Sequence, residues 1–289
     1  MEILVSDDCS QDGTWEVLQD MAGAYKGPHD LRLMRNESNL GIIRNLEKAF
    51  RAASGQLIVK ADGDDVSEPG RVRRIEEEWD KCGHEAMFLA HGTALMDVDG
   101  NAAGHRGFGF SGWSPFGEKD MLWGRPRHYQ GNSCAYRREL ISGFPPVEFP
   151  GAVDDLLLTL RAIAMAGRRA VWHFPDELTR YRMGCGRTND YSAKRRTVAR
   201  TYGMILNAFL QFRQDLARLE GAMEPGRHAD FVKWTDEAVG YYRSAFRLYS
   251  GESLGERLGG FAGLGARGWL SKRLPLFLGM LLSSPGAKS

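Results

Sequence analysis

The sequence has few of the features that mark secreted, membrane-spanning or zinc-binding proteins. Its 4 cysteines among 289 residues lie far apart and form no Cys-x-x-Cys pair, so neither a disulfide framework nor a zinc site is indicated. No basic segment followed by an apolar stretch opens the chain, which argues against a signal peptide. The longest apolar run, Leu274 to Leu282, has nine residues, whereas a spanning helix needs about 20.

An excess of charge of one sign is also missing. The 38 basic and 37 acidic side chains leave a net charge of +1 at pH 7, so no nucleic acid partner is expected. With 43% hydrophobic residues, the chain can bury the core of one large α/β domain plus an appendage. Because the cysteines are widely spaced, we interpret them as reduced thiols, which are typical of cytoplasmic proteins. A cytoplasmic protein is therefore predicted.

Short apolar runs alternate with helical periodicity in the first half of the chain. Strands are expected at residues 3–5, 31–34 and 57–61. Helices are expected at 14–24 and 42–53, and a third from Ser67 and Pro69, as N-cap and first turn, to about Cys82. This alternation favours βαβ units and a parallel sheet. After Ala86, glycine-rich turns predict a mixed-sheet half, followed by a helix at 153–165 and strands near 170–173 and 178–182.

From about Ser192 the pattern becomes purely helical. Two apolar seams with spacings of three and four cover residues 198–219 and 231–248, and a polar link at 220–229 joins them. They predict an antiparallel helical hairpin, which could pack on its own domain or form a dimeric coiled coil. The tail from Gly255 mixes basic and large apolar residues, so it could cover the domain or lie on an anionic membrane surface.

The clearest functional signal is Asp62-Gly63-Asp64-Asp65, at the end of the strand expected at 57–61. Ligands of open α/β sheets bind at the carboxyl ends of the strands, and clustered carboxylates repel one another unless a cation joins them. Mg²⁺ and Mn²⁺ prefer oxygen ligands, and Mg²⁺ is usually held by one or two carboxylates plus substrate phosphates. A metal-bridged nucleotide diphosphate fits this pattern. The alternative is an acidic turn that caps the next helix.

Two further motifs precede this acidic run. Residues 5–14 read Val-Ser-Asp-Asp-Cys-Ser-Gln-Asp-Gly-Thr, and residues 39–45 read Asn-Leu-Gly-Ile-Ile-Arg-Asn. With Gly-Gln-Leu-Ile at 55–58 and Pro-Gly-Arg at 69–71, their order and spacing resemble those of the family-2 glycosyltransferases. The resemblance implies the GT-A fold, a Rossmann-like α/β fold with a mixed sheet that binds nucleotide sugars, here followed by the helical hairpin.

The resemblance also implies roles for individual residues. Asp8 would accept a hydrogen bond from the nucleotide base, with Arg44 and Asn45 on the base and ribose side. Asp62 would contact the ribose or the metal shell. Mn²⁺ or Mg²⁺ would be bound by Asp64 and Asp65. Other polar residues of these motifs could instead bond their own backbone in turns; we favour that interpretation for Asp12 and leave it open for Asp7 and Asn39.

Later segments extend the resemblance towards the acceptor. Residues 131–138 with Gly143-Phe144 look like the family's acceptor-side segment, and Asp154-Asp155 stand where the family has an acidic pair that opens a helix. Asp155 would be the catalytic base that takes the proton of the acceptor hydroxyl; without the upstream motifs, favourable placement in a first helical turn would explain both residues.

A basic segment follows these acidic residues. Tyr181-Arg182 resembles a Tyr-Arg-x-His segment at the diphosphate, although Gly184 replaces the histidine. Arg182 could equally be an outward strand residue.

One departure from the family lies ahead of Glu2. The family begins with a further strand and a Thr-x-Asn type loop, to which nothing in this sequence corresponds. Because that strand lies inside the family's sheet, its absence is expected to expose a strand edge and to weaken base binding. Either the start codon is assigned too late, or the chain is a truncated relative with impaired activity.

We therefore expect a GT-A domain at residues 1–190, with a nucleotide-binding half at 1–105 and an acceptor half at 106–190, and a helical appendage at 191–289. The expected activity is inverting, metal-dependent transfer of a sugar from a nucleotide diphosphate, by default UDP, to a carbohydrate or lipid-linked acceptor in polysaccharide or lipopolysaccharide biosynthesis. The tail could then touch the inner membrane surface. The alternatives are an inactive GT-A module that acts by binding, or a nucleotidyltransferase, which a missing Gly-rich, Lys-containing phosphate loop disfavours.

Overall fold

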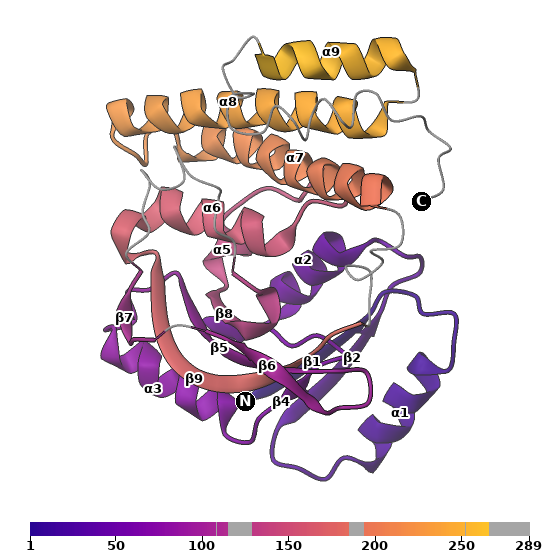
Figure 1. Cartoon of the computed structure of the whole chain (residues 1–289). Helices are drawn as coiled ribbons and strands as arrows, with labels where there is room; N and C mark the ends of the chain where they lie inside the picture. Colours follow the sequence, from indigo (N-terminus) through magenta and orange to yellow (C-terminus); the bar gives the residue numbers. More distant parts are fainter. Residues whose placement is uncertain (108, 115–128, 185–193, 252, 266–289) are drawn as a thin grey trace. The chain divides into compact units, whose positions relative to one another are not determined.

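The computed structural model describes residues 1–107, 109–114, 129–184, 194–251 and 253–265. They belong to two compact units, Met1–Gly186 and Arg187–Ser289. In Figure 1 the first unit runs from indigo to pink and the second from orange to yellow.

A small parallel sheet opens the first unit. Strand β1 (Glu2–Asp7) pairs with β2 (Asp30–Arg35) over its whole length, and helix α1 (Thr14–Ala24) connects them. Helix α2 (Ile42–Ala52) follows and buries Ile43 and Phe50. These bounds confirm the first elements predicted from apolar periodicity.

The larger sheet of this unit has seven strands and is mixed. Its main path runs β3 (Leu57–Val59), β8 (Cys134–Arg137), β5 (Phe88–Met96), β9 (Val171–Arg182) and β4 (Val66–Ser67). Strand β6 (Ala102–Arg106) joins β5, and β7 (Gly112–Trp113) joins β9. Only β5 and β9 run parallel; the other pairs are antiparallel. The mixed α/β fold class is confirmed, but β3 pairs antiparallel with β8 and does not extend a parallel sheet as expected.

Among the described residues several strands have a partner on one side only, and β1 and β3 are two of them. Strand β1 pairs with β2 alone, and β3 pairs with β8 alone. The apolar runs Ile3 to Val5 and Leu57 to Val59 are typical of strands with neighbours on both sides, yet all six residues stay partly exposed. Strands β1 and β3 are therefore edge strands within the described residues.

Helices cover both faces of the larger sheet. Figure 1 shows α5 (Glu139–Ser142) and α6 (Asp154–Ala166) on one side and α3 (Arg71–Lys81) on the other. Ile75 of α3 packs with Leu89, Ala135 and Phe174 of the sheet. Helix α6 is buried from Leu156 to Ala164 without interruption, as in a helix that lies inside the protein. Its first turn is thus held firmly in place.

Two local predictions are wrong. Helix α3 has Gly70 as its N-cap, with φ +79°, while the expected N-cap Ser67 lies in β4. A left-handed residue, which glycine adopts without strain, turns the chain from β4 into the helix. The two strands expected near 170–173 and 178–182 are one strand, β9, which curves strongly in Figure 1. Register shifts on both sides of Gly92 in β5 accommodate Pro175 within β9.

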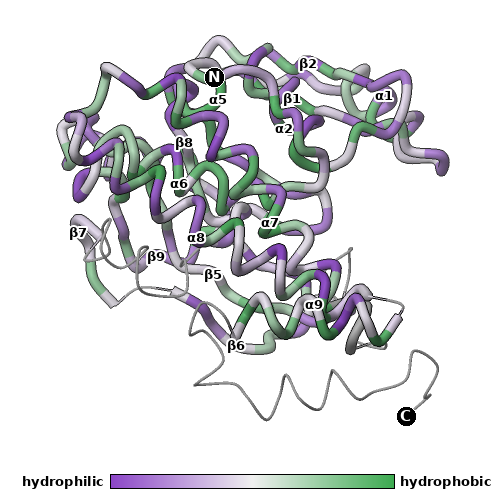
Figure 2. The backbone as a smooth tube through the Cα atoms, turned by 90° about the horizontal axis from the view of Figure 1, so that it is seen from above, coloured by the Kyte–Doolittle hydropathy of each residue, from purple (hydrophilic) through white to green (hydrophobic). Residues whose placement is uncertain are grey.

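The second unit consists of three helices in the described residues, α7 (Lys194–Leu219), α8 (Pro225–Ser250) and α9 (Leu254–Gly265). Ring contacts pair Tyr202 with Tyr249 and Phe212 with Phe231, so α7 and α8 run antiparallel, which confirms the predicted hairpin. Its link is shorter than expected, because α8 already begins at Pro225. Hydrophobic and hydrophilic residues alternate along these helices in Figure 2.

The membrane contact predicted for the C-terminal tail falls largely on residues 266–289, which lie outside the described residues. In the part that is described, no helix has both the length and the apolar character needed to cross a bilayer.

Candidate functional site

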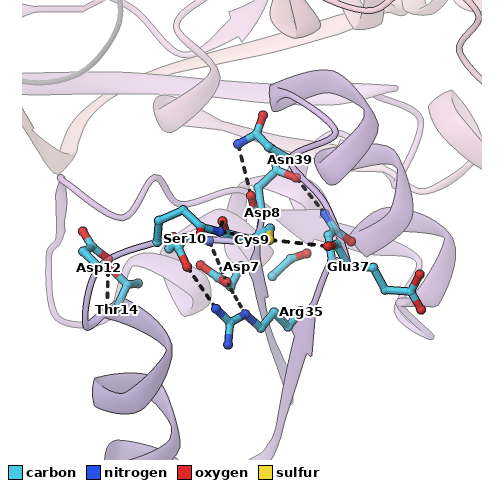
Figure 3. A network of polar contacts seen from close by, with 12 residues as sticks. Asp7, Asp8, Cys9, Ser10, Asp12, Thr14, Arg35, Glu37 and Asn39 are labelled. Carbon is cyan, nitrogen blue, oxygen red and sulfur yellow. Dashed lines mark hydrogen bonds and ion pairs between the residues drawn. The ribbon is translucent and has the colours of Figure 1, made fainter.

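The loop after β1 is held by its own aspartates. Asp7 is buried, with Oδ2 3.3 Å from Arg35 Nε and accepting a 3.1 Å hydrogen bond from the Ser10 amide (Figure 3). Asp12 accepts hydrogen bonds from the hydroxyl and amide of Thr14 at the start of α1, and these bonds lower its pKa. Both carboxylates therefore shape the loop, as predicted for Asp12.

Asp8 connects β1 to the start of α2. Its carboxylate accepts hydrogen bonds from the amides of Leu40 and Gly41, both at 2.8 Å, and from Asn36 Nδ2 at 2.9 Å. A carboxylate has about four acceptor positions, so one stays available to a ligand N–H. The side chain that was predicted to meet the nucleotide base is already held rigidly by the protein.

Asn45 lies in the same network. Its Oδ1 accepts hydrogen bonds from Ser6 Oγ at 2.6 Å and Asn36 Nδ2 at 2.9 Å, and its Nδ2 donates to Ser6 O. Lys48 Nζ donates to Asn36 Oδ1 at 2.8 Å. Sequence reasoning missed Asn36 and Lys48, although Lys48 lies one helical turn after Asn45 and therefore on the same face of α2.

Arg44 contacts a different part of the chain. It donates from Nε to Val147 O at 3.4 Å and from Nη2 to Glu148 O at 3.2 Å. Glu47, on the same helix, accepts hydrogen bonds from the Val147 amide. These side chains attach α2 to the segment after α5. The structure does not bring Arg44 into the network of Asp8 and Asn45.

Of the three carboxylates in the acidic run after β3, Asp62 and Asp65 contact other described residues and Asp64 does not. Asp65 accepts hydrogen bonds from the Arg182 amide at 2.9 Å and from Asn132 Nδ2 at 2.6 Å. Burial raises the pKa of Asp65 in spite of these bonds. The Arg182 guanidinium donates to Asp64 O and Val98 O, which ties the loop to β9. The Asp64 carboxylate is exposed, with no hydrogen bond to another described residue.

This arrangement suits a metal that arrives with a substrate. Within the described residues, no three His, Cys, Asp or Glu side chains converge as ready-made ligands. Asp64 is the more accessible of the two predicted metal ligands, because its side chain is exposed while Asp65 is partly buried and holds Asn132 and the Arg182 amide. Mg²⁺ commonly combines one or two carboxylates with substrate phosphates and water, and an exposed Asp64 fits that mode of binding.

Arg71 connects the residue that precedes the acidic run to two neighbouring segments. Its buried guanidinium donates to Lys60 O at 2.8 Å, Asn132 O at 2.7 Å and His91 Nε2 at 3.1 Å. Burial lowers the pKa of Arg71 to about 10, and burial together with Arg71 lowers the pKa of His91 to about 3. A neutral His91 can accept the hydrogen bond that Arg71 Nε donates to its Nε2 atom. The arginine of the Pro-x-Arg motif thus joins β3, β5 and the 3₁₀ turn Gly131–Ser133.

Lys60 lies at the centre of a buried acidic cluster that the sequence did not reveal. Its Nζ is 2.9 Å from Asp154 Oδ2 and 3.2 Å from Asp62 Oδ1, with the Lys60 side chain 11% exposed. A Cβ on Gly131 would lie 2.5 Å from Nζ, so a larger residue there would displace the end of the lysine from its present position. Burial lowers the pKa of Lys60, but Asp154 and Asp62 outweigh it and leave that pKa raised. The ammonium therefore stays charged.

Asp155 follows in the first turn of α6. Its Oδ1 is buried without a hydrogen-bond partner in the described structure. Burial and the neighbouring Asp154 raise the pKa of Asp155 well above that of an ordinary aspartate, while Lys60 opposes the shift. Beside it on β8, burial also raises the pKa of Cys134, to about 12, and that of Tyr136, so both stay neutral. An orphaned buried oxygen requires an explanation beyond folding.

Comparison with known proteins finds a family match for the first part of the chain. Residues 1–143 match the model of a family described as glycosyl transferase family 2. Residues 1–143 belong to this family. The matched half includes β1 to β8, with the Asp8 network and the acidic loop, so the predicted family is confirmed.

Sequence relatives match only part of this chain. It is 32% identical over 98 residues to "Putative glycosyltransferase EpsE" of Bacillus subtilis, which is 34% of each chain. An uncharacterized protein of Mycobacterium tuberculosis is 26% identical over 140 residues, 48% of this chain and 39% of the relative. The chain thus matches between a third and two fifths of the length of these relatives.

Solved structures show a distant likeness. Staphylococcus aureus TarS 1–349 in complex with UDP-GlcNAc has a TM-score of 0.49 at 15% identity, covering 92% of this chain and 83% of that one. The mannosyltransferase PcManGT from Pyrobaculum calidifontis, in complex with GDP-Man and Mn²⁺, also has a TM-score of 0.49, at 19% identity, covering 97% and 74%.

The predicted site residues of the chain fall into three groups, with Arg44 outside them. Asp8 and Asn45 share a network through Asn36 at the ends of β1 and β2. Asp65 and Arg182 are joined directly. Lys60 links Asp62 to Asp154, the neighbour of Asp155.

Proposed function

We propose that this chain transfers a sugar from a nucleotide diphosphate to an acceptor hydroxyl with inversion at the anomeric carbon, and that Asp155 is the catalytic base. The observation that carries the proposal is the buried, unpartnered Asp155 Oδ1 in the first turn of α6. Folding alone would favour a partner for this atom. An acceptor hydroxyl would supply one.

The proposed reaction is a single displacement. The acceptor oxygen attacks the anomeric carbon, the bond from that carbon to the diphosphate oxygen breaks, and the acceptor proton passes to the Asp155 carboxylate. A raised pKa makes the ionised carboxylate a stronger base, and Asp155 must be ionised to act. Transfer is therefore expected to increase as pH rises through the pKa of Asp155.

The donor is proposed to bind at the ends of β1 and β3. Asp8 has one acceptor position left for a base N–H, which suits uracil or thymine, with Asn45 fixed beside it. Asp64 would hold Mn²⁺ or Mg²⁺ together with the diphosphate, with Asp65 and Arg182 holding the loop in place. The metal would stabilise the negative charge of the leaving diphosphate. Asp62, beside Lys60, is proposed to contact the ribose.

A carbohydrate or lipid-linked acceptor, and a place in polysaccharide or lipopolysaccharide assembly, are proposed from the family alone. The cytoplasmic side of the membrane is the corresponding location. A second candidate is a GT-A module that binds the donor without transfer. Gly184, with φ +83° where the family has a histidine, favours this candidate, because one diphosphate contact would be lost.

Titration calorimetry of the purified chain with UDP and dTDP, each with and without Mn²⁺, tests the donor site. We expect binding that depends on Mn²⁺ and weakens at least tenfold in Asp64→Asn, because the metal would lose its protein ligand. Asp80→Asn, on the exposed surface of α3, is the matched control and should bind as the unmodified chain does. Unchanged binding by Asp64→Asn would contradict the metal assignment. No binding of either nucleotide would contradict the proposed donor site.

A further inference from the structure

Lys60 joins two parts of the proposed site that are far apart in the sequence. Asp62 belongs to the donor loop, and Asp154 lies 94 positions after Lys60 in the first turn of α6. Neighbouring residues contact the Lys60 backbone and the end of its side chain. Its amide donates to Cys134 O at 3.2 Å, its carbonyl accepts from Arg71, and Gly131 leaves no spare room beside Nζ. The ammonium therefore has a fixed position between the two carboxylates.

We propose that Lys60 is a positioning residue, which ties the first turn of α6 to the donor loop through Asp154 and thereby leaves the neighbouring Asp155 oriented and ionisable as the base. The inference rests on the proposed function. It assigns different roles to adjacent aspartates: Asp154 is the ion-pair anchor with a 2.9 Å contact, and Asp155 carries the unpartnered oxygen.

The charges around Asp155 give this role a measurable consequence. Asp62 and Asp154 are its acidic neighbours, Tyr136 and Cys134 on β8 face it in neutral form, and Lys60 is the cation that acts on it. Arg71 lies behind the loop and acts on Asp62 and Asp65. Three carboxylates around one ammonium leave an excess of negative charge. Removing the ammonium must raise the pKa of Asp155, whereas removing the Asp154 charge must lower it.

Two variants of nearly unchanged shape therefore have opposite expected effects. Lys60→Met should move the acidic limb of the pH profile of kcat/KM to higher pH, by about one unit where a nearby opposite charge is removed, because Lys60 lowers the pKa of Asp155. Asp154→Asn should move the limb to lower pH. A purely structural role would reduce the rate in both variants without moving the limb.

The same shifts can be measured without turnover. The ¹³C chemical shift of the Asp155 carboxyl, assigned by its loss in Asp155→Asn, should titrate at higher pH in Lys60→Met and at lower pH in Asp154→Asn than in the unmodified chain. Equal midpoints in all three proteins, or a lower midpoint in Lys60→Met, would overturn the inference. If the unmodified chain fails to transfer any sugar, the proposed function fails while this titration still decides the role of Lys60. Should Lys60→Met not fold, Asp154→Asn still provides a shift of predicted sign.

Discussion

A buried carboxylate oxygen without a hydrogen bond destabilises the folded state, and Asp155 carries one. An unsatisfied buried group costs about 1–3 kcal/mol, and more if it is charged. Lys60 compensates part of this cost by its charge, although it also serves Asp62 and Asp154. Ionisable residues whose pKa is shifted strongly by burial and by a neighbouring charge are often found at functional sites, and Asp155 is such a residue.

Asp155→Asn is expected to make the folded chain more stable. Asparagine keeps the size of the side chain and removes a charge, so the Tm should rise by about 2–4 °C for each ~1 kcal/mol regained. Because the pKa of Asp155 is raised on folding, the carboxylate lowers stability only above its unfolded pKa of about 3.9. The gain should therefore grow as pH rises above 4 and vanish below it.

Calorimetric melting of both proteins between pH 3.5 and 8 checks this prediction. An equal or lower Tm for Asp155→Asn at neutral pH would mean that Asp155 has a stabilising partner and would remove the main argument for its role.

The sequence singled out the aspartates and Arg182 of the proposed site, but not Lys60, the cation between Asp62 and Asp154. Asp62 and Asp64 stand out because carboxylates cluster at the end of an apolar strand. Lys60, by contrast, looks like an ordinary exposed residue of that strand, since lysine is almost never buried without a partner. Its main partner, Asp154, is 94 positions away, and no local pattern predicts that contact. The contacts of Arg44 were likewise not predictable, because its two carbonyl partners come from a loop more than 100 positions away; its predicted place beside the nucleotide stays a prediction.

At the scale of elements, apolar periodicity predicted the bounds of the helices well, whereas single residues taken as signals for the start of a helix did not. The helices α1, α2 and α6 begin and end within one or two residues of their predicted bounds, because their apolar positions recur with the helical period. The two strands expected near 170–173 and 178–182 are one strand, because a shift in register at Gly92 lets β9 continue. Ser67 looked like an N-cap, but Gly70 with its left-handed backbone takes that position.

Two adjacent glycines of α9 should respond to alanine in opposite directions. A Cβ on Gly260 would lie 2.5 Å from Leu248 N and 2.7 Å from Ser244 O of α8, whereas a Cβ on Gly259 would meet nothing within 4 Å. Gly259→Ala should stabilise α9 by up to ~1 kcal/mol through helix propensity. Gly260→Ala should push α9 away from α8, since backbone atoms cannot move aside.

Amide hydrogen exchange across Leu254–Gly265 measures this difference. Protection of α9 should increase in Gly259→Ala and fall in Gly260→Ala. Equal protection in the two variants would mean that α9 does not pack on α8 through Gly260.

At the scale of the whole molecule, the family match and the proposed chemistry overlap only in part. The match ends at residue 143, before the acidic pair of α6 and before Arg182. Both nevertheless lie in the same compact unit, Met1–Gly186, as the matched residues. Direct contacts join residues on the two sides of position 143: Lys60 forms an ion pair with Asp154, and Asp65 accepts a hydrogen bond from the Arg182 amide. The proposed site is therefore continuous in space although the match is not.

The central claim is that this site transfers a sugar with Asp155 as base. The most direct measurement is the rate of nucleoside diphosphate release from UDP- and dTDP-sugars, with Mn²⁺ and hydroxyl acceptors, by the unmodified chain, Asp155→Asn and the surface control Asp80→Asn. We expect release by the first and third proteins, and a rate lower by about 10²–10⁴-fold in Asp155→Asn, with the donor Kd unchanged. Release by Asp155→Asn at the full rate, or no release by the unmodified chain with donor bound, would contradict the claim.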